Sequence, residues 1–110
     1  MINKSTKNRE FNHFNDISNE WWIPNGKFKI LHDITPIRVK YILEQTSNIK
    51  LNESDILDLG CGGGLICEPL ARLKANVTGV DFVEQNINIA KKHAKTAKLN
   101  LQKNGVFHRE

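Results

Sequence analysis

Long apolar runs are missing from this 110-residue sequence, and so is any region rich in positive charge. No segment approaches the ~20 apolar residues of a membrane span, and Met1 to Lys4 lead into polar sequence rather than a signal peptide. The 16 basic and 12 acidic side chains are shared equally by the two halves of the chain. We therefore expect a cytoplasmic protein without a basic domain or arm that binds nucleic acid.

Cysteine is equally scarce, with only Cys61 and Cys67. A structural zinc site needs more ligands at tighter spacing. We therefore expect no metal site and two reduced thiols, one packed in the core and one lining a turn.

The clearest pattern lies in the middle of the chain. The apolar run 56–59 ends in the glycine-rich segment 60–64, and a second apolar run ends at Asp81. This order predicts a strand, a glycine turn, a helix and a second strand, which together form a βαβ unit. The glycines leave room for a ligand near the backbone. Asp81 follows Gly60 by 21 residues, where nucleotide-binding units place a carboxylate on the ribose hydroxyls.

The spacing of the glycines separates two classes of ligand. A dinucleotide fingerprint has glycines at its first, third and sixth positions, and here the sixth position is Leu65. The run is instead Asp58-x-Gly60-x-Gly62-x-Gly64, which resembles the first motif of Rossmann-like methyltransferases that use S-adenosylmethionine. Two alternatives stay open, namely a nicotinamide or flavin site and a structural turn that binds nothing.

The first part of the chain is rich in aromatic residues. Residues 5–22 have the period of an amphipathic helix, and the apolar positions that define it are Phe11, Phe14, Ile17 and Trp21. Such a helix either covers one face of a sheet or forms a lid over a cofactor and a flat apolar substrate. For Trp21 and Trp22 both interpretations remain open. Residues 23–27 predict a turn.

A second helix is expected from Thr35, as its N-cap, to about Thr46, after a connector at residues 28–33. Its inner face would carry Ile37 and Tyr41. Arg38 lies in the first turn, where a cation opposes the helix dipole and so suggests an anionic partner; a solvated arginine is the alternative.

Two further helices are expected after the glycine turn. The first has a buried stripe of Ile66, Leu70 and Leu73, and Pro69 predicts a slight kink or a delayed start. The second spans about residues 83–98, with a small apolar face of Ile87, Ala90, Ala94 and Ala97. Its lysines, Lys91, Lys95 and Lys98, form a solvated face or, as the weaker alternative, a peripheral contact with an anionic membrane such as the inner membrane.

Three segments carry a more specific resemblance: 20–32, with Trp21-Trp22-x-Pro24-Asn25-Gly26; 36–42, with Pro36-Ile37-Arg38; and the glycine motif 58–64. Over residues 9 to 100 the chain resembles the ubiquinone-biosynthesis O-methyltransferases, which methylate a phenol or catechol hydroxyl on a polyprenylated ring. The resemblance implies S-adenosylmethionine as cofactor, with contacts at Arg38, Gly60 and Asp81. Arg38 would meet the methionine carboxylate, the Gly60 backbone the methionyl part, and Asp81 the ribose.

Within the same motif, Asp58 and Gly62 are expected to support the turn, and Asp58 could face the ligand's ammonium group.

The implied fold class is α/β, the N-terminal portion of a Rossmann-like methyltransferase fold. Residues 1–54 would form a helical cap, 55–101 the first βαβα unit, and 102–110 an unpatterned tail. Family members are over twice this length, so a complementing C-terminal chain would have to supply the rest. None of His13, His32, His93 and His108 lies in a motif that marks a catalytic base.

Overall fold

The computed structural model describes residues 20–97 and 105–109, the latter by their backbone only. The chain is α/β, as predicted. A long helix, α2 (Lys29–Gln45), and a short 3-10 turn (Leu51–Glu53) precede the alternating elements. These are β1 (Asp55–Leu59), α3 (Cys67–Arg72), β2 (Asn76–Asp81), α4 (Glu84–Thr96) and β3 (Gly105–Arg109). The expected amphipathic helix at residues 5–22 lies mostly outside the described residues, and residues 20–22 form a turn.

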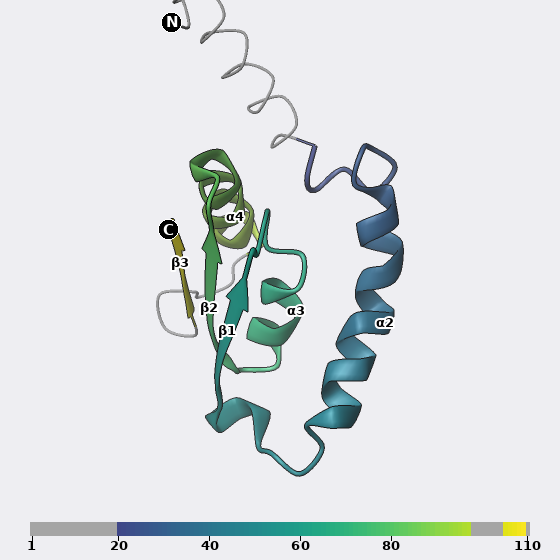
Figure 1. Cartoon of the computed structure of the whole chain (residues 1–110), viewed down its shortest axis with the longest axis vertical. Coiled ribbons are helices and arrows are strands. Elements are labelled where there is room, and N and C mark those ends of the chain that lie inside the picture. The colour runs from purple at the N-terminus through teal and green to yellow at the C-terminus, as the bar shows by residue number, and fades with distance from the viewer. Residues whose placement is uncertain (1–19, 98–104, 110) are drawn as a thin grey trace, which may run out of the picture.

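The three strands form one parallel sheet in the order β1-β2-β3 (Figure 1). Ile56 pairs with Val77, and Val77 pairs with Gly105. Both crossovers step in the same direction, so right-handed connections place α3 and α4 on the same face of the sheet. The predicted βαβ unit is therefore confirmed. The expectation that residues 102–110 form an unpatterned tail is wrong, because they contain β3, which pairs with the second edge of β2. A run of five residues is too short to show a period in the sequence.

The core lies between β2 and the two helices. It consists mainly of small side chains, which let the helices approach the sheet closely: Cys61, Cys67, Leu70, Ala71, Ala75, Val77, Ile87, Ala90 and Ala94. The predicted face of α4 is thus confirmed at Ile87, Ala90 and Ala94. In α3, Leu70 is buried as expected, whereas Leu73 follows the helix end and is 43% exposed. Pro69 falls in the first turn of α3, which confirms the delayed start, since a first-turn proline loses no helical hydrogen bond.

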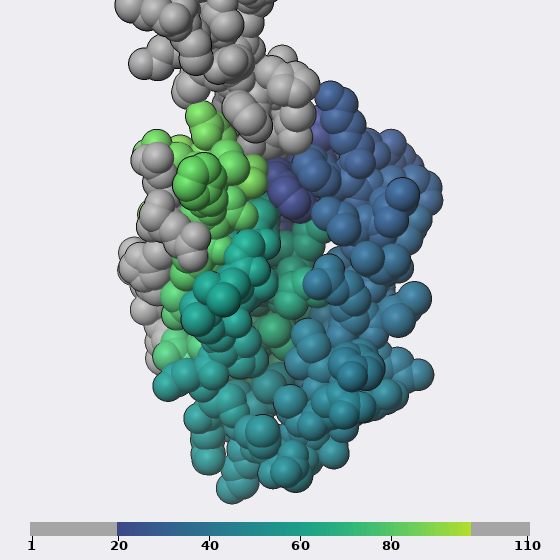
Figure 2. Space-filling model, in the orientation of Figure 1, coloured from purple at the N-terminus to yellow at the C-terminus, as the bar shows by residue number. Residues whose placement is uncertain are grey.

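Helix α2 begins seven residues earlier than predicted, at Lys29 and not at Pro36. Thr35 and Pro36 lie inside it, so Thr35 is not an N-cap; its hydroxyl instead donates to the Leu31 carbonyl at 2.5 Å. The expected inner face is also wrong, because Ile37 is 68% exposed and Tyr41 63% exposed. Ile42 provides the contact with the core. In the space-filling view, α2 in blue and β1 in teal are separate surfaces with α3 visible between them (Figure 2).

Strand β1 forms one edge of the sheet. Its side chains alternate, with Ile56 and Asp58 half-buried on the helix-covered side and Leu57 and Leu59 exposed on the other side. Among the described residues, no strand lies beside the outer edge of β1. In the same part of the chain, no helix is both long and apolar enough to span a membrane.

Candidate functional site

The glycine turn follows β1 at the carboxyl end of the sheet. The N–H groups of Gly60 and Cys61 both donate to the Val80 carbonyl, at 2.7 and 3.0 Å, which ties the turn to β2. Gly60 has a φ of 73° and Gly62 a φ of 56°, a region that side chains rarely adopt. A Cβ built on Gly60 would meet no described atom within 4 Å, so the backbone at Gly60 is open to a ligand.

Asp81 ends β2 directly beside this turn and is 8% exposed. Its Oδ2 accepts the Gly62 N–H at 2.8 Å, and its Oδ1 accepts the Val83 N–H at 2.8 Å. The Asn86 amide adds a longer contact to Oδ1, at 3.4 Å. Asp81 therefore fixes the glycine turn to the start of α4. Because each carboxylate oxygen has more than one acceptor position, it can still take a further donor.

Asp58 lies in β1, half-buried, and its Oδ2 accepts the Cys67 thiol at 3.2 Å. Burial raises the pKa of Asp58 and the nearby Asp81 charge adds to the rise, while the Cys67 bond and the charge of Arg38 oppose it. The Cys67 thiol has a raised pKa as well, through its hydrogen bond with Cys61 and then through burial. Both cysteines are buried free thiols, and Cys67 fixes the Asp58 carboxylate.

Four of the five predicted site residues therefore come together. Asp58, Gly60, Gly62 and Asp81 all lie at the carboxyl ends of β1 and β2. Arg38 is exposed on α2. It interacts with these four residues through its charge, which opposes the rise that burial causes in the pKa of Asp58.

Trp21 packs directly against the turn. A Cβ on Gly62 would come within 2.5 Å of its Cη2, and a Cβ on Gly63 within 2.6 Å of its Cγ. The indole stacks on Phe28 with a centroid distance of 3.9 Å, and its Nε1 donates to Asn86 Oδ1 at 2.9 Å. Trp21 therefore packs against the glycine turn, Phe28 and Asn86.

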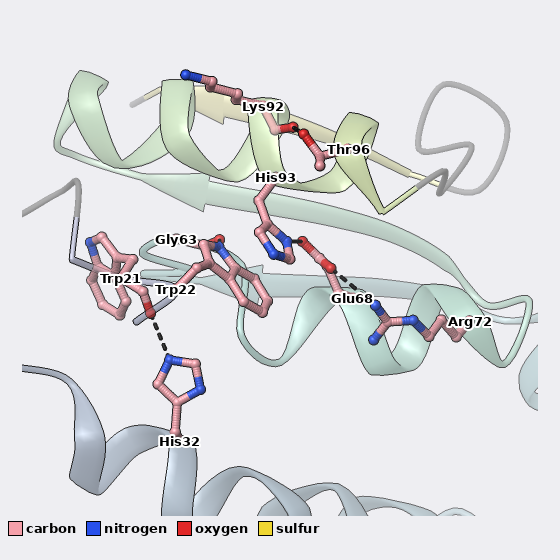
Figure 3. Close-up of polar contacts among 9 residues, drawn as sticks. All are labelled: Trp21, Trp22, His32, Gly63, Glu68, Arg72, Lys92, His93 and Thr96. Atoms are coloured by element: carbon pink, nitrogen blue, oxygen red, sulfur yellow. Dashed lines mark hydrogen bonds and ion pairs between the residues drawn. The ribbon is translucent and has the colours of Figure 1, made fainter. Parts of the chain in front are cut away.

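Trp22 packs beside it, over the gap between α3 and α4 (Figure 3). Its Nε1 donates to the Gly63 carbonyl at 2.8 Å, and its ring stacks on His93 at 3.5 Å. His93 Nδ1 lies 2.7 Å from Oε2 of Glu68, a fully buried carboxylate whose other oxygen is 3.4 Å from Arg72. Burial raises the pKa of Glu68, and His93 and Arg72 oppose that rise.

The two histidines with described side chains both serve this packing. His32 Nε2 lies 2.7 Å from the Trp21 carbonyl, which can only accept, so Nε2 carries the proton. His93 contacts Glu68 as above. His13 lies outside the described residues, and His108 is described only as part of β3. Within the described ranges, no group of three His, Cys, Asp or Glu side chains could hold a metal.

Known proteins match the region of the chain that contains this turn. A family model described as a methyltransferase domain matches residues 56–106. The ubiquinone biosynthesis O-methyltransferase of Pelagibacter ubique is 47% identical over 105 residues, which cover 88% of this chain and 44% of that protein. The Coxiella burnetii protein of the same name is 49% identical over 92 residues, covering 84% and 38%. Over 84 to 88% of its own length, the chain is similar to ubiquinone-biosynthesis O-methyltransferases.

Similarity of fold extends to more distant methyltransferases. The structure of the bifunctional kinase-methyltransferase WbdD matches with a TM-score of 0.52 and 29% identity, over 66% of this chain and 16% of that one. The chain spans about two fifths of the length of the curated family members named above, between 38 and 44%.

The family motif includes Gly60 and Asp81, but no pattern in the sequence indicates a role for Asn86. The asparagine lies five residues after Asp81, on the first turns of α4, so its side chain returns toward the end of β2. An asparagine at that position belongs to no motif in the sequence. Only the fold shows that it bridges Trp21 and Asp81.

Proposed function

We propose that this chain binds S-adenosylmethionine at the carboxyl ends of β1 and β2, as the cofactor-binding part of an O-methyltransferase. One observation supports this most directly: the open backbone of Gly60 lies between two carboxylates, Asp58 and Asp81, at the ends of neighbouring strands. Ligands of open α/β sheets bind at this end of the strands.

Each residue has a role that its chemistry suits. Asp81 accepts from the ribose hydroxyls, and the Gly60 backbone lets the methionyl part lie close to the turn. Asp58 faces the ammonium group, and Arg38 pairs with the methionine carboxylate as a charge-assisted contact. The bound cofactor supplies an electrophilic methyl group on its sulfonium.

The proposed acceptor is a phenol or catechol hydroxyl on a polyprenylated ring, from the name and chemistry of the family. Methyl transfer of this kind depends mainly on holding the oxygen in line with the methyl group. The chain spans 38 to 44% of the relatives' length, so we propose that a complementing C-terminal chain provides the acceptor site.

A second candidate is a cofactor-binding module without catalysis. It is favoured by the contacts of His32 and His93, which are both committed to packing around the two tryptophans. The dinucleotide alternative is disfavoured by Leu65, which is 7% exposed where that fingerprint requires a third glycine.

Calorimetry of the chain with S-adenosylhomocysteine and with NAD tests the cofactor. We expect S-adenosylhomocysteine to bind more tightly, and tighter binding of NAD would contradict the proposal. Asp81→Ala should lose about 2–3 kcal/mol of affinity, as for hydrogen bonds to a charged group, and Asp81→Asn less. Asp55→Asn, at the amino end of β1, is the control and should bind normally.

A transfer assay with labelled methyl groups and a catechol distinguishes the two candidates. The chain alone should show no turnover above background, and addition of a C-terminal family segment should restore it. Restoration supports the enzyme, whereas binding without restoration supports the module.

A further inference from the structure

We infer that Trp21 and Asn86 are positioning residues for the cofactor turn: they orient the Asp81 carboxylate and, through it, the Gly62 backbone. This inference rests on the proposed binding of S-adenosylmethionine and adds two residues that the glycine motif does not include. Its evidence is a continuous set of contacts from the segment before α2 to the turn.

The first link fixes the orientation of an amide. An indole N–H can only donate, so Trp21 Nε1 must face the oxygen of Asn86, and their distance is 2.9 Å. With Oδ1 so occupied, the Asn86 Nδ2 group is directed at Asp81 Oδ1, 3.4 Å away. If the amide turned over, its oxygen would face a carboxylate oxygen, which is repulsive. Trp21 therefore selects the orientation in which the Asn86 amide donates to Asp81.

The second link transfers this orientation to the turn. Asp81 Oδ1 receives the Val83 N–H in addition to the Asn86 amide, which leaves Oδ2 directed at the Gly62 N–H, at 2.8 Å. Gly62 has a φ of 56°, a conformation that its own residue type permits but does not impose. The bond from Asp81 supplies the missing constraint.

The third observation is that the same indole packs directly on the turn. Trp21 lies against Gly62 and Gly63 so closely that neither position has room for a Cβ, and Phe28 stacks on the indole. Gly62 is thus held by both the Trp21 ring and the Asp81 carboxylate. A turn ordered in advance saves the free energy of ordering it when the cofactor binds.

Two substitutions test the hydrogen bonds without removing the packing. Trp21→Phe keeps the stacked ring but loses its N–H, and Asn86→Ala removes the bridge. We expect S-adenosylhomocysteine affinity, measured by calorimetry, to fall about 5- to 10-fold in each, the effect of losing one net hydrogen bond. Amide exchange at Gly62, followed by NMR, should accelerate. Asn76→Ala is the matched control, because Asn76 donates to Asp55 at 2.9 Å at the opposite end of the same two strands.

A third variant separates positioning from general stability. Asn86→Asp keeps an acceptor for Trp21 but sets a carboxylate against Asp81, so at neutral pH it should bind more weakly than Asn86→Ala. As the pH falls and the new side chain is protonated, it regains a donor. Its affinity relative to Asn86→Ala should then rise.

The outcomes are distinct. Normal affinity and normal Gly62 exchange in Trp21→Phe and Asn86→Ala would overturn the inference, as would equal losses in Asn76→Ala. If the unmodified chain binds no S-adenosylhomocysteine, the proposed function fails, and Gly62 exchange alone decides whether Trp21 and Asn86 position the turn.

Discussion

The indole of Trp22 lies flat on the imidazole of His93, with ring centroids 3.5 Å apart and planes within 1° of parallel. These residues are 71 positions apart in the chain, and their contact attaches the segment before α2 to α4. On its other side, His93 is bonded to Glu68 of α3. One histidine therefore joins three parts of the chain, which makes it a sensitive position for stability.

His93→Phe should destabilise the chain by about 1–3 kcal/mol, the range for leaving a buried acceptor without its partner. The new ring preserves the stack on Trp22, so the loss reports the bond to Glu68, which is fully buried. Urea unfolding followed by tryptophan fluorescence measures it. Lys92→Ala, at an exposed neighbour on α4, is the control. Equal stability of His93→Phe and the unmodified chain would show that Arg72 alone satisfies Glu68.

Asp58→Asn should raise the stability of the chain at neutral pH while weakening cofactor binding. Burial raises the folded-state pKa of Asp58 above its ordinary value of 3.8, so ionisation at higher pH favours the unfolded chain. The asparagine avoids this cost and can still accept from Cys67. The advantage should be absent below pH 3.8, where Asp58 is protonated in both states, and should grow as pH rises to the folded pKa. Thermal unfolding at several pH values checks it; a gain that does not vary with pH would contradict the explanation.

Alanine substitutions should distinguish the two sides of the glycine turn. Gly60→Ala meets open space and should lose only about 1–2 kcal/mol, from the left-handed backbone. Gly62→Ala adds a collision with Trp21, which raises the expected loss to about 2–4 kcal/mol. Denaturant unfolding gives both values. If the smaller loss is found at Gly62, Trp21 does not occupy the position seen here.

The central βαβ unit was predictable because each of its signals is local. The apolar runs, the glycines and the closing carboxylate all lie within 26 residues, from Ile56 to Asp81. Their arrangement is dictated by strand length and by the left-handed conformations that only glycine adopts readily. Asp58, Gly60, Gly62 and Asp81 could therefore be placed together from the sequence.

The errors arose where distant contacts decide the structure. Thr35-Pro36 is typical of a helix start, but the preceding turn is also helical and carries a Lys29–Asp33 pair at 2.6 Å. The five residues of β3 gain their structure from the edge of β2. The roles of Trp21 and Asn86 depend on a contact across 65 positions, which no local pattern indicates.

The exposed edge of β1 leads to the last prediction, that the chain self-associates through this strand. Leu57 is 59% exposed on the face away from α3 and α4, and in the described part of the chain β1 pairs only with β2. An apolar edge strand offers unpaired backbone groups to another chain, and a lysine there disfavours such pairing.

Leu57→Lys should therefore reduce association, measured by sedimentation velocity over a range of concentrations. Folding should be little affected, because substitutions at exposed sites typically change stability by about 0.5 kcal/mol or less. Ile37→Lys is the matched control, since Ile37 is an equally apolar residue, 68% exposed, on α2. If Ile37→Lys disperses the chain and Leu57→Lys does not, the association surface lies on α2. A decrease confined to Leu57→Lys places it on β1, because only there do unpaired backbone groups accompany the exposed side chain.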